Sequence, residues 1–162
     1  MMQPKRIYIL RHGNAEPYSA TLDEQRQLTE LGVAEVESTA RAFSERCESF
    51  DAVFVSPYIR AQQTSKVFLA AFDSTKNVVT SSLITPYGNV MDVAAWLVAQ
   101  PYQSILLITH QPFAYQLVEY LADEVLPTSV SMSTATLVSL EGELLASACC
   151  QFRWCISPLE LK

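Results

Sequence analysis

Three short apolar segments of this sequence are each followed by polar side chains that could do chemistry. These side chains are Arg11 and His12 after residues 7–10, Ser56 and Arg60 after residues 52–55, and Thr109 and His110 after residues 105–108. The chain has two histidines, and both occupy such a position. One histidine alone is most often a hydrogen-bonded structural residue. Here both histidines of the chain follow an apolar segment, and arginines follow two of the three segments. This pattern favours a functional cluster.

Arginine and histidine side chains together suit a phosphate-like dianion. Guanidinium groups present planar pairs of N–H donors, and imidazoles and helix N-termini add further donors. The sequence has no G-x-S-x-G segment, no G-x-x-x-x-G-K-[ST] loop and no cysteine followed six residues later by arginine. Serine hydrolases, P-loop nucleotide triphosphatases and cysteine phosphatases are therefore disfavoured. A neutral imidazole remains as a nucleophile that could attack phosphorus directly.

The elements that position these residues can be read from the apolar pattern. Ile7–Leu10, Ala52–Val55 and Ile105–Ile108 are short, continuous and apolar, which is typical of strands buried on both faces. Helical patterns between and after them predict helices that begin near Thr29, at Ser56-Pro57 and running to about Phe72, after Asn89, and at Pro112. Residues 136–156 predict one or two further strands.

Strands that alternate with helices predict an α/β fold with a mostly parallel central sheet covered on both faces. In such a sheet the ligand crevice lies off the carboxyl ends of the strands, where the helices begin. The polar residues at the three segment ends should therefore converge. The length of 162 residues predicts one domain spanning residues 1–162.

The net charge of −6, from 17 acidic and 11 basic residues, disfavours nucleic acid and anionic membranes as partners. No stretch approaches the roughly 20 apolar residues of a membrane span, and the first ten residues lack the apolar core of a signal peptide. We therefore expect a cytoplasmic protein.

The four cysteines fit that expectation as reduced thiols. Cys149, Cys150 and Cys155 lie close together in sequence, but their spacing is irregular and both histidines are distant. This favours buried structural thiols over a metal site, and we expect no metal and no cofactor.

Several segments in order resemble the histidine phosphatase superfamily, which includes the cofactor-dependent phosphoglycerate mutases, and more narrowly its small SixA-type protein phosphohistidine phosphatases. The segments are RHG-x-A from Arg11, RQLT from Arg26 followed by Gly32, SPYIRAQQT from Ser56, Leu83 with TPYG from Thr85, and THQP from Thr109. The resemblance covers nearly the whole chain. It implies a three-layer αβα fold of phosphoglycerate mutase type.

The resemblance implies that His12 is the nucleophile and that Arg11, Arg60 and His110 surround the phosphate. Arg26 matches the arginine of the family's R-P-L-T segment, although Gln27 replaces the proline. We also expect Gly13, Ser133 and Thr134 to contribute to substrate binding, and Thr64 to be a helix-surface or capping hydroxyl.

The proton donor used by many relatives that cleave phosphate esters is missing from its usual places. Gln111 follows the second histidine, and Asn14 stands where an acidic residue often follows RHG. The nearby carboxylates Glu16, Asp23 and Glu24 fit solvated loop charges better than an acid. A phosphohistidine can be protonated on its own ring and leave as neutral imidazole, so a missing acid favours a P–N substrate.

The resemblance thus implies a phosphohistidine phosphatase that acts through a covalent phosphohistidine on His12. Its expected partners are histidine-containing phosphotransfer domains or phosphocarrier proteins. Two alternatives stay open: a phosphatase of small phosphomonoesters on the same fold, and a binding module that recognises phosphoproteins without turning them over.

Overall fold

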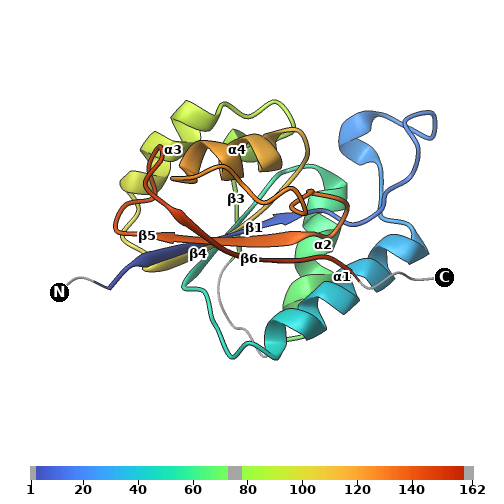
Figure 1. The fold of residues 1–162 in the computed structure, drawn as a ribbon. Coiled ribbons are helices and arrows are strands. Elements are labelled where there is room, and N and C mark those ends of the chain that lie inside the picture. Colours follow the sequence, from blue (N-terminus) through green and yellow to red (C-terminus); the bar gives the residue numbers. More distant parts are fainter. Residues whose placement is uncertain (1–2, 73–77, 159–162) are drawn as a thin grey trace.

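The protein is built on a six-stranded sheet with strand order β3-β2-β4-β1-β5-β6 (Figure 1). The computed structural model describes residues 3–72 and 78–158. The strands are β1 (Lys5–Arg11), β2 (Ala52–Val55), β3 (Val78–Thr80), β4 (Ser104–Thr109), β5 (Leu137–Gly142) and β6 (Gln151–Ile156). The helices are α1 (Glu30–Ser44), α2 (Ile59–Ala70), α3 (Val90–Val98) and α4 (Phe113–Leu121), with 3-10 turns at Asp23–Gln25 and Ser82–Ile84.

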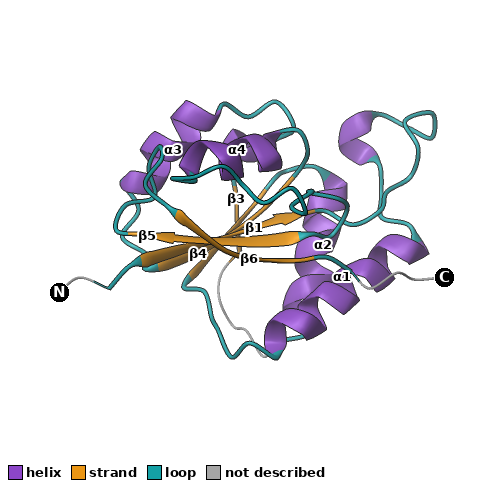
Figure 2. Ribbon diagram, in the orientation of Figure 1, coloured by secondary structure: helices purple, strands orange, loops and turns teal. Residues whose placement is uncertain are grey.

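The first four strands are parallel, and the last two add an antiparallel edge. Helices α1 and α2 cover one face of the sheet, and α3 and α4 cover the other (Figure 2). The expected three-layer αβα arrangement with a mostly parallel sheet is therefore confirmed. Residues 136–156, for which one or two strands were expected, form two, β5 and β6. Strand β3 was not predicted, because its three residues are exposed and carry no run of buried apolar side chains.

Alternate residues of each central strand belong to the two opposite cores. In β1, Ile7 and Ile9 pack with α3 and α4, whereas Tyr8 and Leu10 pack with α1 and α2. All four side chains are fully buried. This is why the strand reads as a continuous apolar run instead of an alternating one.

The helix starts agree with the sequence in three cases and differ in one. Helix α4 begins directly after Pro112, as predicted. Thr29 accepts a hydrogen bond from the Gly32 backbone N–H, and Asn89 accepts from Met91 and Asp92, so both are N-caps as predicted. Helix α2 instead begins after Tyr58 without a side-chain cap. The prediction that Ser56 caps this helix is wrong, because the helix begins at Ile59 with Tyr58 as its N-cap residue; the Ser56 hydroxyl accepts the Tyr58 N–H and lies 2.7 Å from Nε2 of His110.

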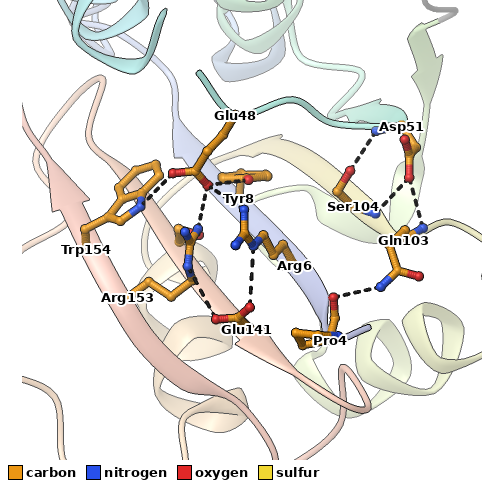
Figure 3. A network of polar contacts seen from close by, with 11 residues as sticks. Pro4, Arg6, Tyr8, Glu48, Asp51, Gln103, Ser104, Glu141, Arg153 and Trp154 are labelled. Atoms are coloured by element: carbon orange, nitrogen blue, oxygen red, sulfur yellow. Dashed lines mark hydrogen bonds and ion pairs between the residues drawn. The ribbon is translucent and has the colours of Figure 1, made fainter. Parts of the chain in front are cut away.

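A polar network lies at the amino-terminal edge of the parallel strands (Figure 3). Glu48 accepts hydrogen bonds from Arg6, Tyr8, Arg153 and Trp154, at 3.2, 2.8, 2.7 and 3.3 Å. Burial, together with the bond to Glu48, raises the pKa of Tyr8 to about 12 and keeps its hydroxyl a donor. The network joins β1 and β6 to the segment that follows α1.

The cysteines are only partly as expected. Of the three clustered cysteines, Cys150 is buried and Cys155 half-buried, but Cys149 is exposed, so the expectation of buried thiols is wrong for Cys149. Among residues 3–72 and 78–158, no helix combines the length and apolar character that crossing a membrane would require.

Candidate active site

The parallel strands β1, β2 and β4 end side by side, and their register fixes where the following residues lie. Arg11 pairs with Thr109, and Val55 pairs with Ile108. The ladder continues one residue further, because the His12 N–H donates to the Thr109 carbonyl and the Ser56 N–H to the Ile108 carbonyl, both at 3.0 Å. The two histidine rings are thereby brought to a centroid distance of 5.2 Å.

The hydrogen bonds of His12 define its tautomer. Nδ1 lies 2.7 Å from the carbonyl oxygen of Gly13, and a carbonyl can only accept, so Nδ1 carries the proton. Nε2 then holds a lone pair, and Nε of Arg60 donates to it at 3.2 Å. His12 is therefore held as a neutral imidazole with its lone pair directed toward an arginine.

The contacts of His110 do not select its tautomer. The Ser56 hydroxyl accepts the Tyr58 backbone N–H at 3.3 Å and lies 2.7 Å from Nε2 of His110. Because a hydroxyl can both donate and accept, either tautomer of His110 satisfies this contact. His110 is fully buried, and its Nδ1 has no hydrogen-bond partner among the described residues.

Burial dominates the electrostatics of both imidazoles. Desolvation, with the nearby positive charges of Arg60, Arg11 and Arg26, lowers the pKa of His12 to about 3. Desolvation, with the His12 ring and the same arginines, lowers the pKa of His110 to about 2. Both rings are therefore neutral at physiological pH, as a nucleophile requires.

Three arginines surround the histidines. Arg60 is 3% exposed, and Arg26 is also buried. Arg11 donates through Nη1 to the Met132 carbonyl at 3.0 Å, while its buried Nε has no partner among the described residues. Buried polar atoms normally find partners, so the two unpaired atoms, Arg11 Nε and His110 Nδ1, mark a place suited to a ligand. Because Arg11 Nε can only donate, an acceptor-rich anion fits there.

The remaining predicted residues differ in how close they lie to this cluster. Gly13 follows His12, and a Cβ there would lie 2.6 Å from the Gly32 carbonyl oxygen, so a side chain has no room. Thr134 lines the hollow beside His12, but Ser133 is exposed and its hydroxyl pairs with that of Thr136. Thr64 is fully buried, not on the surface, and accepts the Gly13 N–H at 3.2 Å.

Comparisons with known proteins agree with this arrangement. The model of the histidine phosphatase superfamily (branch 1) matches residues 7–85. Phosphohistidine phosphatase SixA of Escherichia coli strain K12 is 31% identical over 159 residues, which is 96% of each chain. The chain belongs to the histidine phosphatase superfamily. A SixA homolog of Haemophilus influenzae is 32% identical over 147 residues, covering 84% of this chain and 88% of the relative.

Solved structures of histidine phosphatases extend the likeness to the fold. The protein histidine phosphatase SixA complexed with tungstate superposes with a TM-score of 0.83 at 29% identity, covering 94% of this chain and 97% of the other. A SixA-type protein of Agrobacterium tumefaciens gives a TM-score of 0.81 at 25% identity, covering 96% and 99%. The phosphoglycerate mutase-like fold expected from the sequence is thus confirmed.

The hollow at the centre of this histidine phosphatase site is small. Its volume is about 210 Å³, and it is lined by Arg11, His12, Asn14, Ala15, Tyr18, Arg26, Arg60, Gln111 and Thr134. Sites that enclose small molecules usually measure about 300–1,000 Å³. This hollow therefore suits a phosphoryl group presented from outside better than a whole metabolite.

Sequence reasoning missed three residues of the site. Asp23 forms ion pairs with Arg26 and Arg60, so its interpretation as a solvated loop charge is wrong. Tyr18 stacks under the Arg26 guanidinium, with 4.0 Å from Cζ to the ring centroid. Glu35 accepts hydrogen bonds from the Asn14 N–H and the Thr134 hydroxyl. An acidic residue three positions before Arg26 was the one available signal; Tyr18 and Glu35 had none.

Proposed function

We propose that this protein is a phosphohistidine phosphatase that transfers a phosphoryl group from a histidine of another protein to Nε2 of His12, and then to water. One observation carries the proposal. The neutral Nε2 lone pair of His12 lies in the cluster that contains two buried polar atoms without partners among the described residues. These are Arg11 Nε, which is a donor, and His110 Nδ1, which is a donor in the tautomer that we propose. A nucleophile next to vacant donors is what phosphoryl transfer requires.

In the first step, Nε2 of His12 attacks phosphorus while the P–N bond of the substrate breaks. The electron pair of that bond goes to the departing imidazole, which carries a proton on its other ring nitrogen and leaves neutral. His12 keeps its own proton on Nδ1, hydrogen-bonded to the Gly13 carbonyl. The phosphorylated ring is thus an imidazolium whose charge is offset by the phosphoryl oxygens.

In the second step, water attacks phosphorus and the bond to Nε2 of His12 breaks. The electron pair returns to Nε2, which restores the starting tautomer, and the proton of the water passes to phosphate or solvent. Because the leaving imidazole needs no proton on Nε2, this step requires no carboxylic acid at the leaving group. Neutral imidazole is a far better leaving group than an alkoxide.

The surrounding residues take roles that match their contacts. Arg11, Arg60 and His110 bind the phosphoryl oxygens, and Arg26 adds a further positive charge at the rim. The guanidinium groups supply the charge stabilisation that metal ions supply in other phosphoryl-transfer enzymes. Gly13 fixes the His12 backbone, and Thr134 borders the entrance of the hollow.

The position after the second histidine supports a P–N substrate over a phosphate ester. Gln111 lines the hollow there, and its Oε1 accepts the Tyr115 backbone N–H at 2.9 Å. No carboxylic acid stands at this point to protonate an alkoxide. The relatives named as phosphohistidine phosphatases further support the assignment.

The partner we propose is a phosphohistidine-bearing protein, either a histidine phosphotransfer domain or a phosphocarrier, in the cytoplasm. The small hollow supports a protein substrate, because a phosphohistidine side chain can be presented to it from a larger surface. Tungstate, which the SixA structure contains, is a tetrahedral oxyanion like phosphate.

A comparison of substrates tests the proposal. Wild-type protein and His12→Ala should be assayed with a phosphohistidine-bearing phosphocarrier and with a sugar phosphate, each with and without EDTA. We expect turnover of the phosphoprotein only, its loss in His12→Ala, and no effect of EDTA. A preference for the sugar phosphate would favour a phosphomonoester phosphatase. Binding of the phosphoprotein without turnover would favour a recognition module.

A further inference from the structure

Asp23 is the carboxylate most closely joined to the phosphate-binding arginines. Its Oδ1 accepts from Arg26 Nε at 2.9 Å, and its Oδ2 lies 3.4 Å from Arg60 Nη2. The side chains of Arg26 and Arg60 are 8% and 3% exposed, whereas that of Asp23 is 29% exposed. One carboxylate therefore spans two nearly buried guanidinium groups from the solvent side.

The backbone of Asp23 strengthens the connection. Its carbonyl oxygen accepts from Arg60 Nη1 at 2.6 Å and from the Arg26 backbone N–H at 3.3 Å. Residues 23–25 form a 3-10 turn, so the carbonyl and the carboxylate of Asp23 are presented by the same short element. Arg60 is thereby directed at His12, to which its Nε donates.

We propose that Asp23 is a positioning residue of the phosphate site, which holds the guanidinium groups of Arg26 and Arg60 in the orientation that binds the phosphoryl group. The inference rests on the proposed function and adds a residue to it. Long arginine side chains lose rotamer freedom when they are fixed, and a shared carboxylate makes that loss part of folding instead of part of substrate binding.

The negative charge of Asp23 alone would affect phosphate affinity in the opposite direction to the proposed positioning role. A negative charge close to an anion site repels the anion, so removing a carboxylate should, by charge alone, tighten phosphate binding. A positioning role predicts weaker binding when the carboxylate is removed. The two effects can therefore be separated by the direction of the change.

Glu24 provides the matched control. It is the next residue of the same turn, it is exposed, and no hydrogen bond or ion pair joins it to the arginines of the described site. Glu24→Ala removes the same charge from nearly the same place without removing a contact to Arg26 or Arg60. It reports the charge effect alone.

The test is binding of inorganic phosphate, measured by isothermal titration calorimetry at pH 7.5 without turnover. We expect Asp23→Ala to raise the phosphate Kd about tenfold or more, with a thermal midpoint close to that of the wild type. Glu24→Ala should leave the Kd within about twofold or lower it. Asp23→Asn keeps an acceptor oxygen for Arg26 but not a second one for Arg60, so its Kd should lie between those of the wild type and Asp23→Ala.

Wild-type affinity or tighter binding in Asp23→Ala would overturn the positioning role. If Asp23→Ala does not fold, Asp23→Asn decides, and an unchanged or lower Kd in that variant would overturn it as well. Absence of phosphate binding by the wild type would overturn the inference together with the phosphate site. Phosphate binding without phosphohistidine turnover would remove the proposed function and leave the Asp23 result standing.

Discussion

Hydrogen bonds hold both histidine rings. The Gly13 carbonyl fixes the proton of His12 on Nδ1, whereas the Ser56 hydroxyl pairs with Nε2 of His110 and leaves its Nδ1 without a partner among the described residues. One ring therefore presents a lone pair at Nε2, and the other presents Nδ1. The roles that we propose, nucleophile for His12 and oxyanion donor for His110, require the His110 proton on Nδ1.

Titration by nuclear magnetic resonance tests this division, because the chain has no other histidine. Burial lowers the pKa values to about 3 and about 2, so in tag-free, phosphate-free protein neither ring should gain a proton between pH 8 and pH 5. Nitrogen shifts should show the proton on Nδ1 in both rings. A titration with a midpoint near 6.5, the ordinary value for histidine, would contradict the account.

At the residue scale, the sequence indicated the cluster of arginines and histidines but not the residues that hold them in place. Arg11, His12, Arg60 and His110 were found because they follow strands whose ends must meet in a parallel sheet. Asp23 was missed because it lies on an irregular loop, where no periodicity tells which way a side chain points.

At the scale of elements, the start of α1 determines the shape of the segment after His12. A Cβ on Gly32 would collide with the backbone of Asn14, and one on Gly13 would collide with the backbone of Gly32. The first turn of α1 and the His12 segment thus pack backbone against backbone. Glycine is needed at both positions for this close approach.

Gly32→Ala should separate α1 from the His12 segment. We expect a loss of about 1–3 kcal/mol in the free energy of unfolding from overpacking, and weaker phosphate binding in the protein that remains folded. Urea denaturation and calorimetry measure the two effects.

Gly142→Ala is the control for this substitution. Its Cβ would collide with the Cys149 backbone at the opposite edge of the sheet, so stability should fall but the phosphate Kd should not change. Equal phosphate affinity in Gly32→Ala and the wild type would show that the packing of α1 does not shape the site.

The helix starts show which boundaries can be predicted from neighbouring residues alone. Thr29 and Asn89 cap their helices as predicted, since a capping hydrogen bond involves only neighbouring residues. Ser56 has the same local signal, but the helix begins three residues later, and the Ser56 hydroxyl contacts both the Tyr58 N–H and His110, which is 54 residues away. A tertiary contact of this kind cannot be recognised from the helix-start pattern alone.

At the scale of the whole molecule, the two ends of the parallel strands differ in their polar residues. The carboxyl ends of the parallel strands carry the neutral histidines and two buried polar atoms without partners among the described residues, whereas the amino ends carry charges that are paired around Glu48 (Figure 3). The alternation of strands and helices along the chain was predictable, apart from β3, because apolar segments alternate with helical patterns. The Glu48 network was not, because its members come from β1, β6 and a loop far apart in sequence.

Glu48→Ala should reduce stability without affecting the site. The Glu48 side chain is 12% exposed, and its removal leaves Arg153 and Tyr8 without their shared acceptor, so we expect a loss of about 2–4 kcal/mol in the free energy of unfolding. Glu141→Ala, which breaks longer contacts of 3.5 and 3.6 Å, should cost less. The phosphate Kd should be unchanged in both variants, and a large change would contradict the separation of the two ends of the parallel strands.

The pH dependence of stability should differ between Glu48→Ala and the wild type. Burial raises the pKa of Glu48, but hydrogen bonds from Arg153 and Tyr8 and the charges of Arg153 and Arg6 outweigh it, and the net pKa is lowered. A lowered pKa means that the unfolded chain takes up the proton first. This contribution is therefore present at neutral pH and lost as pH falls below the ordinary value of about 4.5. Unfolding of Glu48→Ala should depend less on pH in that range than unfolding of the wild type.

The central claim is that Nε2 of His12 becomes phosphorylated during turnover. The most direct measurement is rapid acid-free quenching of the protein mixed with a ³²P-labelled phosphohistidine protein, followed by localisation of the label. We predict label on His12 that is stable in base and labile in acid, and none in His12→Ala. Turnover of the substrate with no label on His12, or with label on another residue, would contradict the account.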